Sequence, residues 1–158
     1  MTAATTVRSI WLDEDDAPDR IEERLRSGRI DAREAADLRK FADDGYVVVS
    51  TDVSASDAAE FDRNIDRLWR EKPRGVAFAY DSPPYRMSTS IEREHRKPRY
   101  RLHDIHSAFD LARRFYLDPM LLRYASLILD QPAVATQSLY FEFGSQQALH
   151  RDSIVVPT

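Results

Sequence analysis

Residues 139–152, LYFEFGSQQALHRD, decide how this sequence is interpreted. The first half alternates Leu139, Phe141 and Phe143 with polar or amphipathic residues, which predicts a strand followed by a turn at residues 144–147. The second half ends in His150-Arg151-Asp152, and residues two apart on a strand point to the same face. The His150 imidazole and the Asp152 carboxylate could therefore supply two of the three ligands of a 2-His-1-carboxylate iron(II) site.

No third ligand for such a site is evident in the sequence. A second cluster, His103, Asp104 and His106, could be taken for a metal site, but a turn into a helix with Asp104 or Ser107 as its cap is the favoured interpretation. His95 lies in a charged segment that is typical of a solvated surface. A His-x-Asp pair also occurs by chance in many proteins, so the surrounding residues decide what it means.

The composition narrows the classes of protein that this chain can represent. The 158 residues include 23 basic and 27 acidic ones, for a net charge of −4, which argues against nucleic-acid or anionic-membrane binding. No run of 18 apolar residues is present, and the N-terminus lacks the pattern of a secretory signal. Cysteine is absent, so any metal must be held by His, carboxylate or water, and a cytoplasmic location is expected.

Helical patterns fill most of the chain before the decisive stretch. Asp31 with Glu34 forms a capping-box pattern, and Tyr46-Val47-Val48-Val49 is predicted as a buried strand because of its β-branched and aromatic residues. Residues 73–98, which are rich in Pro, Arg, Ser and Tyr, are predicted as a long loop. Helices are expected over residues 18–27, 31–44, 54–69, 107–116 and 118–129. The third should bury the stripe of Phe61, Ile65, Leu68 and Trp69, the fourth places Phe109, Ala112 and Phe115 together, and the last has Asp118 as its cap. Further strands are expected over residues 133–143 and 149–156.

This order of elements predicts an α+β fold in a single domain over residues 1–158, with a helical segment at 1–45 and the sheet and its supporting helices at 46–158. A sheet of two or three strands without partners leaves unpaired edges and exposed apolar faces. We therefore expect the chain to be the N-terminal part of a longer domain, and its strand edges to offer a route to self-association.

Three segments together resemble the phytanoyl-CoA dioxygenase family. They are FADDGYVVV at residues 41–49, DPML at residues 118–121 and the stretch at residues 139–152. The resemblance covers roughly residues 30–158, and it depends on the order and spacing of the segments, because each one alone is a weak signal. It implies a double-stranded β-helix, a cupin-like jelly roll, preceded by helices.

Members of this family are iron(II)- and 2-oxoglutarate-dependent oxygenases, so the resemblance implies that His150 and Asp152 bind iron. The implied reaction hydroxylates an unactivated C–H bond of a small-molecule substrate with molecular oxygen, and it releases succinate and carbon dioxide. Asp152 favours hydroxylation over halogenation, because related halogenases replace this carboxylate with a small residue. The family's distal His and the Arg that binds 2-oxoglutarate would lie on strands later than Thr158.

Two residues on the preceding strand, Gln137 and Tyr140, are candidates for contact with 2-oxoglutarate. An amide and an aromatic side chain are equally ordinary on a half-buried strand, so both interpretations stay open. The basic residues within 93–101 could bind a phosphate or carboxylate, but a solvated surface is the favoured interpretation.

Two hypotheses from other classes compete with an oxygenase. The chain could be a non-catalytic fragment that serves as a binding or assembly module, or it could be a half-fold that another chain completes.

Overall fold

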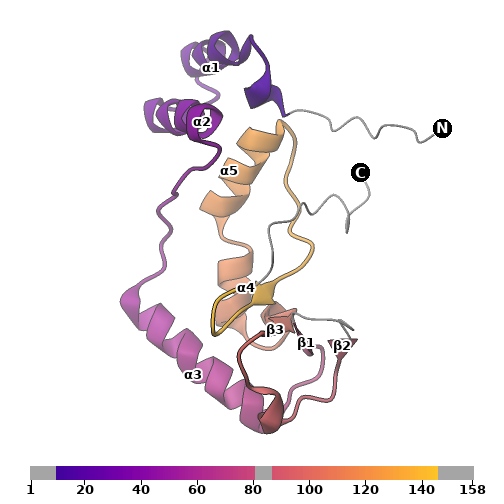
Figure 1. The fold of residues 1–158 in the computed structure, drawn as a ribbon. Helices are drawn as coiled ribbons and strands as arrows, with labels where there is room; N and C mark the ends of the chain where they lie inside the picture. Colours follow the sequence, from indigo (N-terminus) through magenta and orange to yellow (C-terminus); the bar gives the residue numbers. More distant parts are fainter. Residues whose placement is uncertain (1–9, 81–86, 146–158) are drawn as a thin grey trace, which may run out of the picture. The chain divides into compact units, whose positions relative to one another are not determined.

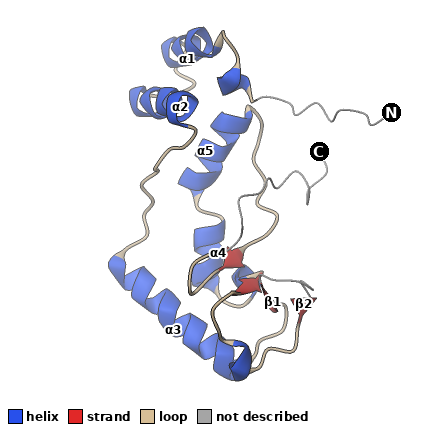
Figure 2. Cartoon of the chain, viewed as in Figure 1, coloured by secondary structure: helices blue, strands red, loops and turns tan. Residues whose placement is uncertain are grey.

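The computed structural model describes residues 10–80 and 87–145 (Figure 1). Over these ranges it combines α-helices with β-strands (Figure 2). The strands form one small antiparallel sheet of four in the order β2-β1-β3-β4. The α+β class predicted from the sequence is therefore confirmed. A double-stranded β-helix stays a prediction, because the described strands form a single open sheet.

The chain divides into two compact units, and each is discontinuous in sequence. The first, here called the helical unit, combines Met1–Asp52 with Leu117–Val134, and the second, the sheet unit, combines Val53–Tyr116 with Ala135–Thr158. The single domain expected over residues 1–158 stays a prediction. None of the helices in the described ranges is long and apolar enough to cross a membrane.

The helical unit contains the 3-10 turn η1 (Trp11–Asp13) and the helices α1 (Ala17–Arg26), α2 (Ala32–Asp44) and α5 (Pro119–Leu129). The predicted capping box is present: Asp31 accepts the Glu34 N–H at 2.8 Å, and Glu34 accepts the Asp31 N–H at 3.0 Å. The shared core consists of small and aliphatic side chains around one indole: Trp11, Leu12, Ala17, Ile21, Ile30, Ala35, Leu38 and Leu127.

Trp11 connects the start of the described chain to α5. Its indole N–H donates to the Leu127 carbonyl at 2.9 Å, and the guanidinium groups of Arg20 and Arg24 lie 4.7 and 4.0 Å from its ring centroid. Both guanidinium groups also pair with Asp130, at 2.8 and 2.7 Å. Asp130 ends α5 in a left-handed conformation, so this one carboxylate joins the end of α5 to α1.

The sheet unit begins with α3 (Ala55–Glu71), which is capped by Ser54. Its strands are β1 (Ala77–Tyr80), β2 (Met87–Ser88), β3 (Tyr100–His103) and β4 (Leu139–Tyr140), and its other helical segments are η2 (Arg93–His95), η3 (Ile105–Ser107) and α4 (Asp110–Tyr116). As predicted from their spacing, Ile65, Leu68 and Trp69 of α3 are buried, and they share one core with residues of β1 and β3. Burial of this apolar face accounts for most of the stability of such a helix.

Gly75 shapes the connection between α3 and β1. Its φ of +89° lies in the left-handed region, and an added Cβ would meet the Ser107 Oγ at 3.0 Å. The Ser107 hydroxyl donates to the Gly75 carbonyl at 3.2 Å, so glycine is required both by the backbone conformation and by this close approach.

Two strand predictions and one loop prediction are corrected by the structure. Residues 46–49 form no strand: Tyr46 is 56% exposed and Val48 is 78% exposed, because no described strand lies beside them to cover a pleated face. The segment predicted as a loop at 73–98 contains β1, β2 and η2, since the short apolar run at residues 77–80 pairs with β3. Of residues 133–143, only Leu139 and Tyr140 are paired as a strand.

The cap of α2 gives a stability prediction for the helical unit. Asp31→Ala removes the acceptor for the Glu34 N–H, and it should lower the free energy of unfolding by about 1 kcal/mol. Asp43→Ala, an exposed carboxylate near the other end of the same helix, is the matched control and should leave stability within about 0.5 kcal/mol. Urea unfolding followed by circular dichroism measures both, and equal losses would contradict the capping role.

Candidate functional site

The residues singled out in the sequence fall into two groups. His150 and Asp152 lie outside the described residues, so their predicted metal-binding role stays a prediction. Tyr140 lies in β4, at one edge of the described sheet, and Gln137 lies two residues before this strand. The candidate site that can be built from the structure is therefore the part of the sheet unit around β4.

The register of β4 against β3 positions this site. Leu102 pairs with Tyr140 and His103 pairs with Leu139. The ladder is extended by the Asp104 N–H, which donates to the Ser138 carbonyl at 2.9 Å. Asp104 then takes a left-handed conformation with φ of 58°, which turns the chain from β3 into η3, as the predicted turn at this position requires. Residues 137–140 are thus placed beside residues 102–106.

His103 and Gln137 form the first polar pair across this register. The Gln137 Nε2 lies 3.1 Å from the His103 Nδ1, and with the amide nitrogen as donor the imidazole proton resides on Nε2. That Nε2 is buried and has no hydrogen-bond partner in the described ranges, and the His103 side chain is only 4% exposed. Burial, together with the nearby Arg101 charge, lowers the pKa of His103 below its usual 6.5, so the ring stays neutral near pH 7.

His106 and Ser138 form the second pair. The His106 Nδ1 and the Ser138 Oγ lie 2.7 Å apart, and the imidazole stacks on Tyr116 with a centroid distance of 4.1 Å and an interplanar angle of 12°. The imidazoles of His103 and His106, considered above as an alternative metal site, therefore each pair with a residue just before β4.

A charged network holds the chain just after β4. Arg96 donates three hydrogen bonds to the Glu142 carboxylate, at 3.1, 2.9 and 2.5 Å, and it pairs with Asp66 at 2.7 Å. The Tyr100 hydroxyl donates a short hydrogen bond to Glu142. Burial alone would raise the pKa of Glu142, but the hydrogen bonds from Arg96 and Tyr100 outweigh it and hold the pKa below its usual value. Arg96 therefore does not belong to the solvated surface expected for residues 93–101, whereas Arg93, Lys97 and Arg99 are exposed.

Tyr140 lines a cavity of about 260 Å³ in the sheet unit. Other walls come from Phe61 of α3, Phe115 and Tyr116 of α4, Ile105 and Ser138. Burial, with the nearby Glu142 and Asp62 charges, raises the pKa of Tyr140 to about 12, so its hydroxyl stays protonated near neutral pH. The sequence predicted Phe61 as a core residue and placed Phe115 beside Phe109 and Ala112 on a helix, but positions on two helices do not reveal that a hollow lies between them.

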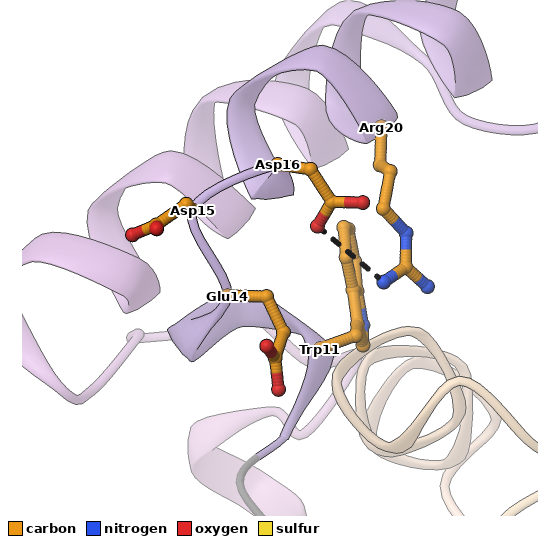
Figure 3. Close-up of a pocket in the computed structure, with 5 residues that line it drawn as sticks. All are labelled: Trp11, Glu14, Asp15, Asp16 and Arg20. Atoms are coloured by element: carbon orange, nitrogen blue, oxygen red, sulfur yellow. Dashed lines mark ion pairs between the residues drawn. The ribbon is translucent and has the colours of Figure 1, made fainter.

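The helical unit has a separate, acidic pocket, lined by Trp11, Glu14, Asp15, Asp16 and Arg20 (Figure 3). Asp16 pairs with Arg20 at 3.9 Å, and Figure 3 shows the Asp15 carboxylate pointing away from them. No three His, Asp or Glu side chains in the described ranges converge as a metal site would require. This pocket is therefore a surface of ion pairs around the Trp11 indole.

Comparisons of the chain with protein families, curated proteins and solved structures gave no match. The resemblance to the phytanoyl-CoA dioxygenase family accordingly rests on the residues quoted for it, and the function it implies is a proposal.

The buried His103 predicts a dependence of stability on pH. Because its folded-state pKa lies below 6.5, the unfolded chain takes up a proton first as the pH falls, and the protein loses stability in that window. His103→Asn keeps a polar partner for Gln137 but cannot titrate. The gap in unfolding free energy between wild type and this variant should therefore be larger at about pH 8 than at about pH 5.5. Urea titrations at both pH values measure it, and an unchanged gap would refute this role of His103.

Proposed function

We propose that this chain carries part of an iron(II)- and 2-oxoglutarate-dependent oxygenase, with His150 and Asp152 as two of the metal ligands and a double-stranded β-helix as the complete fold. The single observation that carries the proposal is the His-x-Asp motif at the end of residues 139–152, preceded by the resemblance over residues 41–49 and 118–121. Iron, when bound, would activate oxygen for hydroxylation of a C–H bond as 2-oxoglutarate is converted to succinate and carbon dioxide.

The described residues support this proposal at Gln137. Its amide is presented by the segment that leads to the motif, and its bond to His103 fixes the orientation of the side chain. His103 remains neutral and adds no charge. A fixed, uncharged donor is a suitable partner for a carboxylate of 2-oxoglutarate, so Gln137 is our preferred cosubstrate contact.

Tyr140 is the weaker of the two cosubstrate candidates. The carboxylates of Glu142, Asp62 and Asp66 act electrostatically on its hydroxyl, and Arg96, the nearby cation, is already paired with two of them. These charges oppose a dianionic ligand at this position. In the proposed enzyme Tyr140 therefore shapes the wall beside β4.

Iron binding tests the proposal directly. The chain should bind iron(II) weakly, because two ligands without a fixed third position do not hold a metal tightly. His150→Ala and Asp152→Ala should each weaken that binding by about tenfold or more, since even an outer-shell partner contributes roughly this much. Calorimetric titration with iron(II) under nitrogen gives the affinities, and succinate formation from 2-oxoglutarate is a second readout.

His95→Asn is the matched control for those variants. His95 accepts the Glu92 N–H through Nδ1 at 3.0 Å, and the asparagine carbonyl can replace that acceptor. Iron affinity that is unaffected by His150→Ala and Asp152→Ala, or equally reduced by His95→Asn, would refute the proposed ligands.

One observation favours the alternative of a half-fold completed by another chain. Residues 46–49 include three β-branched valines but pair with no described strand, and Val48 is 78% exposed. Such a segment is suited to pairing with a strand of a second polypeptide.

Self-association through this segment has a measurable signature. If wild type forms an oligomer through this segment, Val48→Lys should dissociate it, because the substitution places a charge in the strand pair between the two chains. Val134→Lys, at a position that is 80% exposed, is the control and should not dissociate the oligomer. Light scattering across protein concentrations measures the mass, and a wild type that is monomeric throughout would contradict this alternative for copies of the chain.

A further inference from the structure

Half of the residues that line the cavity beside β4 are aromatic, and their rings are held by neighbouring rings. Phe61 stacks on Phe115 with a centroid distance of 5.3 Å and an angle of 19°, and it meets Tyr140 at 5.6 Å and 54°. One face of Tyr116 is covered by His106, which is itself held by Ser138. Because these rings are held by one another and by His106, the hollow is largely preformed, as small-molecule sites usually are.

Two hydroxyl groups of this wall, those of Tyr116 and Tyr140, make no hydrogen bond with any described residue, whereas the neighbouring Ser138 hydroxyl already contacts His106. Because the Tyr140 hydroxyl stays protonated, it can donate to an acceptor on a ligand. An apolar site with a few polar groups selects ligands by position as well as by shape.

The charges around the cavity exclude one class of ligand. Asp62, Asp66 and Glu142 act on Tyr140 as negative charges, and Arg96 is committed to Asp66 and Glu142 at 2.7 and 2.5 Å. An anion placed at the Tyr140 hydroxyl would meet net repulsion in a partly buried setting, where charges interact more strongly than in water. The ligand must therefore be uncharged at its acceptor.

The volume limits the size of the ligand. The cavity measures about 260 Å³, below the roughly 300 Å³ at which pockets for drug-sized ligands begin. A cavity of about 150 Å³ holds benzene. One ring with a short substituent therefore fits.

We infer that this cavity is a binding site for an uncharged, single-ring aromatic molecule whose carbonyl or ether oxygen accepts a hydrogen bond from Tyr140. The ring packs against Phe61, Phe115 and Tyr116. This inference goes beyond the proposed oxygenase, because the site is built from described residues of α3, α4 and β4 and needs neither iron nor His150 and Asp152.

Three probes of nearly equal size separate the contributions. Acetophenone has the ring and the acceptor, ethylbenzene has only the ring, and benzoate has a negative charge in place of the ketone. With the full chain and a metal chelator present, acetophenone should bind saturably, ethylbenzene about fivefold to tenfold more weakly because it lacks one hydrogen bond, and benzoate more weakly still. Chemical-shift titration of amide signals from α4 and β4 measures all three affinities.

Two variants make the assignment specific. Tyr140→Phe removes only the hydroxyl, so it should reduce acetophenone affinity about fivefold to tenfold and leave ethylbenzene unchanged. Tyr80→Phe is the matched control: its hydroxyl contacts the His95 carbonyl at 3.3 Å, away from the cavity wall, and it should change neither affinity.

The inference is overturned if acetophenone does not bind saturably, if benzoate binds as tightly, or if Tyr140→Phe and Tyr80→Phe behave alike. These outcomes leave the proposed oxygenase untouched, since the assay contains no iron. Conversely, if His150 and Asp152 prove not to bind iron, the expected affinities of the three probes stay the same.

Discussion

The pairing of His103 with Leu139 across β3 and β4 is the constraint on which the candidate site depends. Side chains on a strand alternate between two faces, so a shift of one residue would reverse every one of them. In the observed register Gln137 reaches His103, Ser138 reaches His106, and Tyr140 reaches Phe61 of α3. The short pairing of β3 with β4 thus determines which polar side chains pair and which residues line the aromatic cavity.

The short ladder is reinforced at both ends. Before it, the Asp104 N–H bonds to the Ser138 carbonyl, and after it, Glu142 is held by Arg96 and Tyr100. Charge-assisted, bidentate hydrogen bonds of this kind are directional, so they fix the register more than they add to the total stability. The Glu142 carboxylate also acts as a negative charge on Tyr140. The interaction that fixes the register therefore also restricts the ligands that the neighbouring cavity can accept.

Predictions from the sequence succeeded where the cause is local. The capping box of Asp31 and Glu34, the Asp118 cap followed by Pro119, and the apolar face of α3 all depend on residues within a few positions of one another. They failed where the cause is a partner far along the chain. Residues 46–49 have high strand propensity but no described strand beside them, whereas residues 77–80 form a strand because residues 100–103 pair with them.

The sequence by itself determined the α+β class, most helix boundaries, and the presence of a His-x-Asp pair behind a strand-like segment, because these depend on composition and short-range spacing. The tertiary structure alone decided that Tyr140 belongs to an aromatic cavity among carboxylates, and that His103 is buried against Gln137. Those relations join residues 34 or more positions apart, and only the strand register and the packing of α3 bring them together.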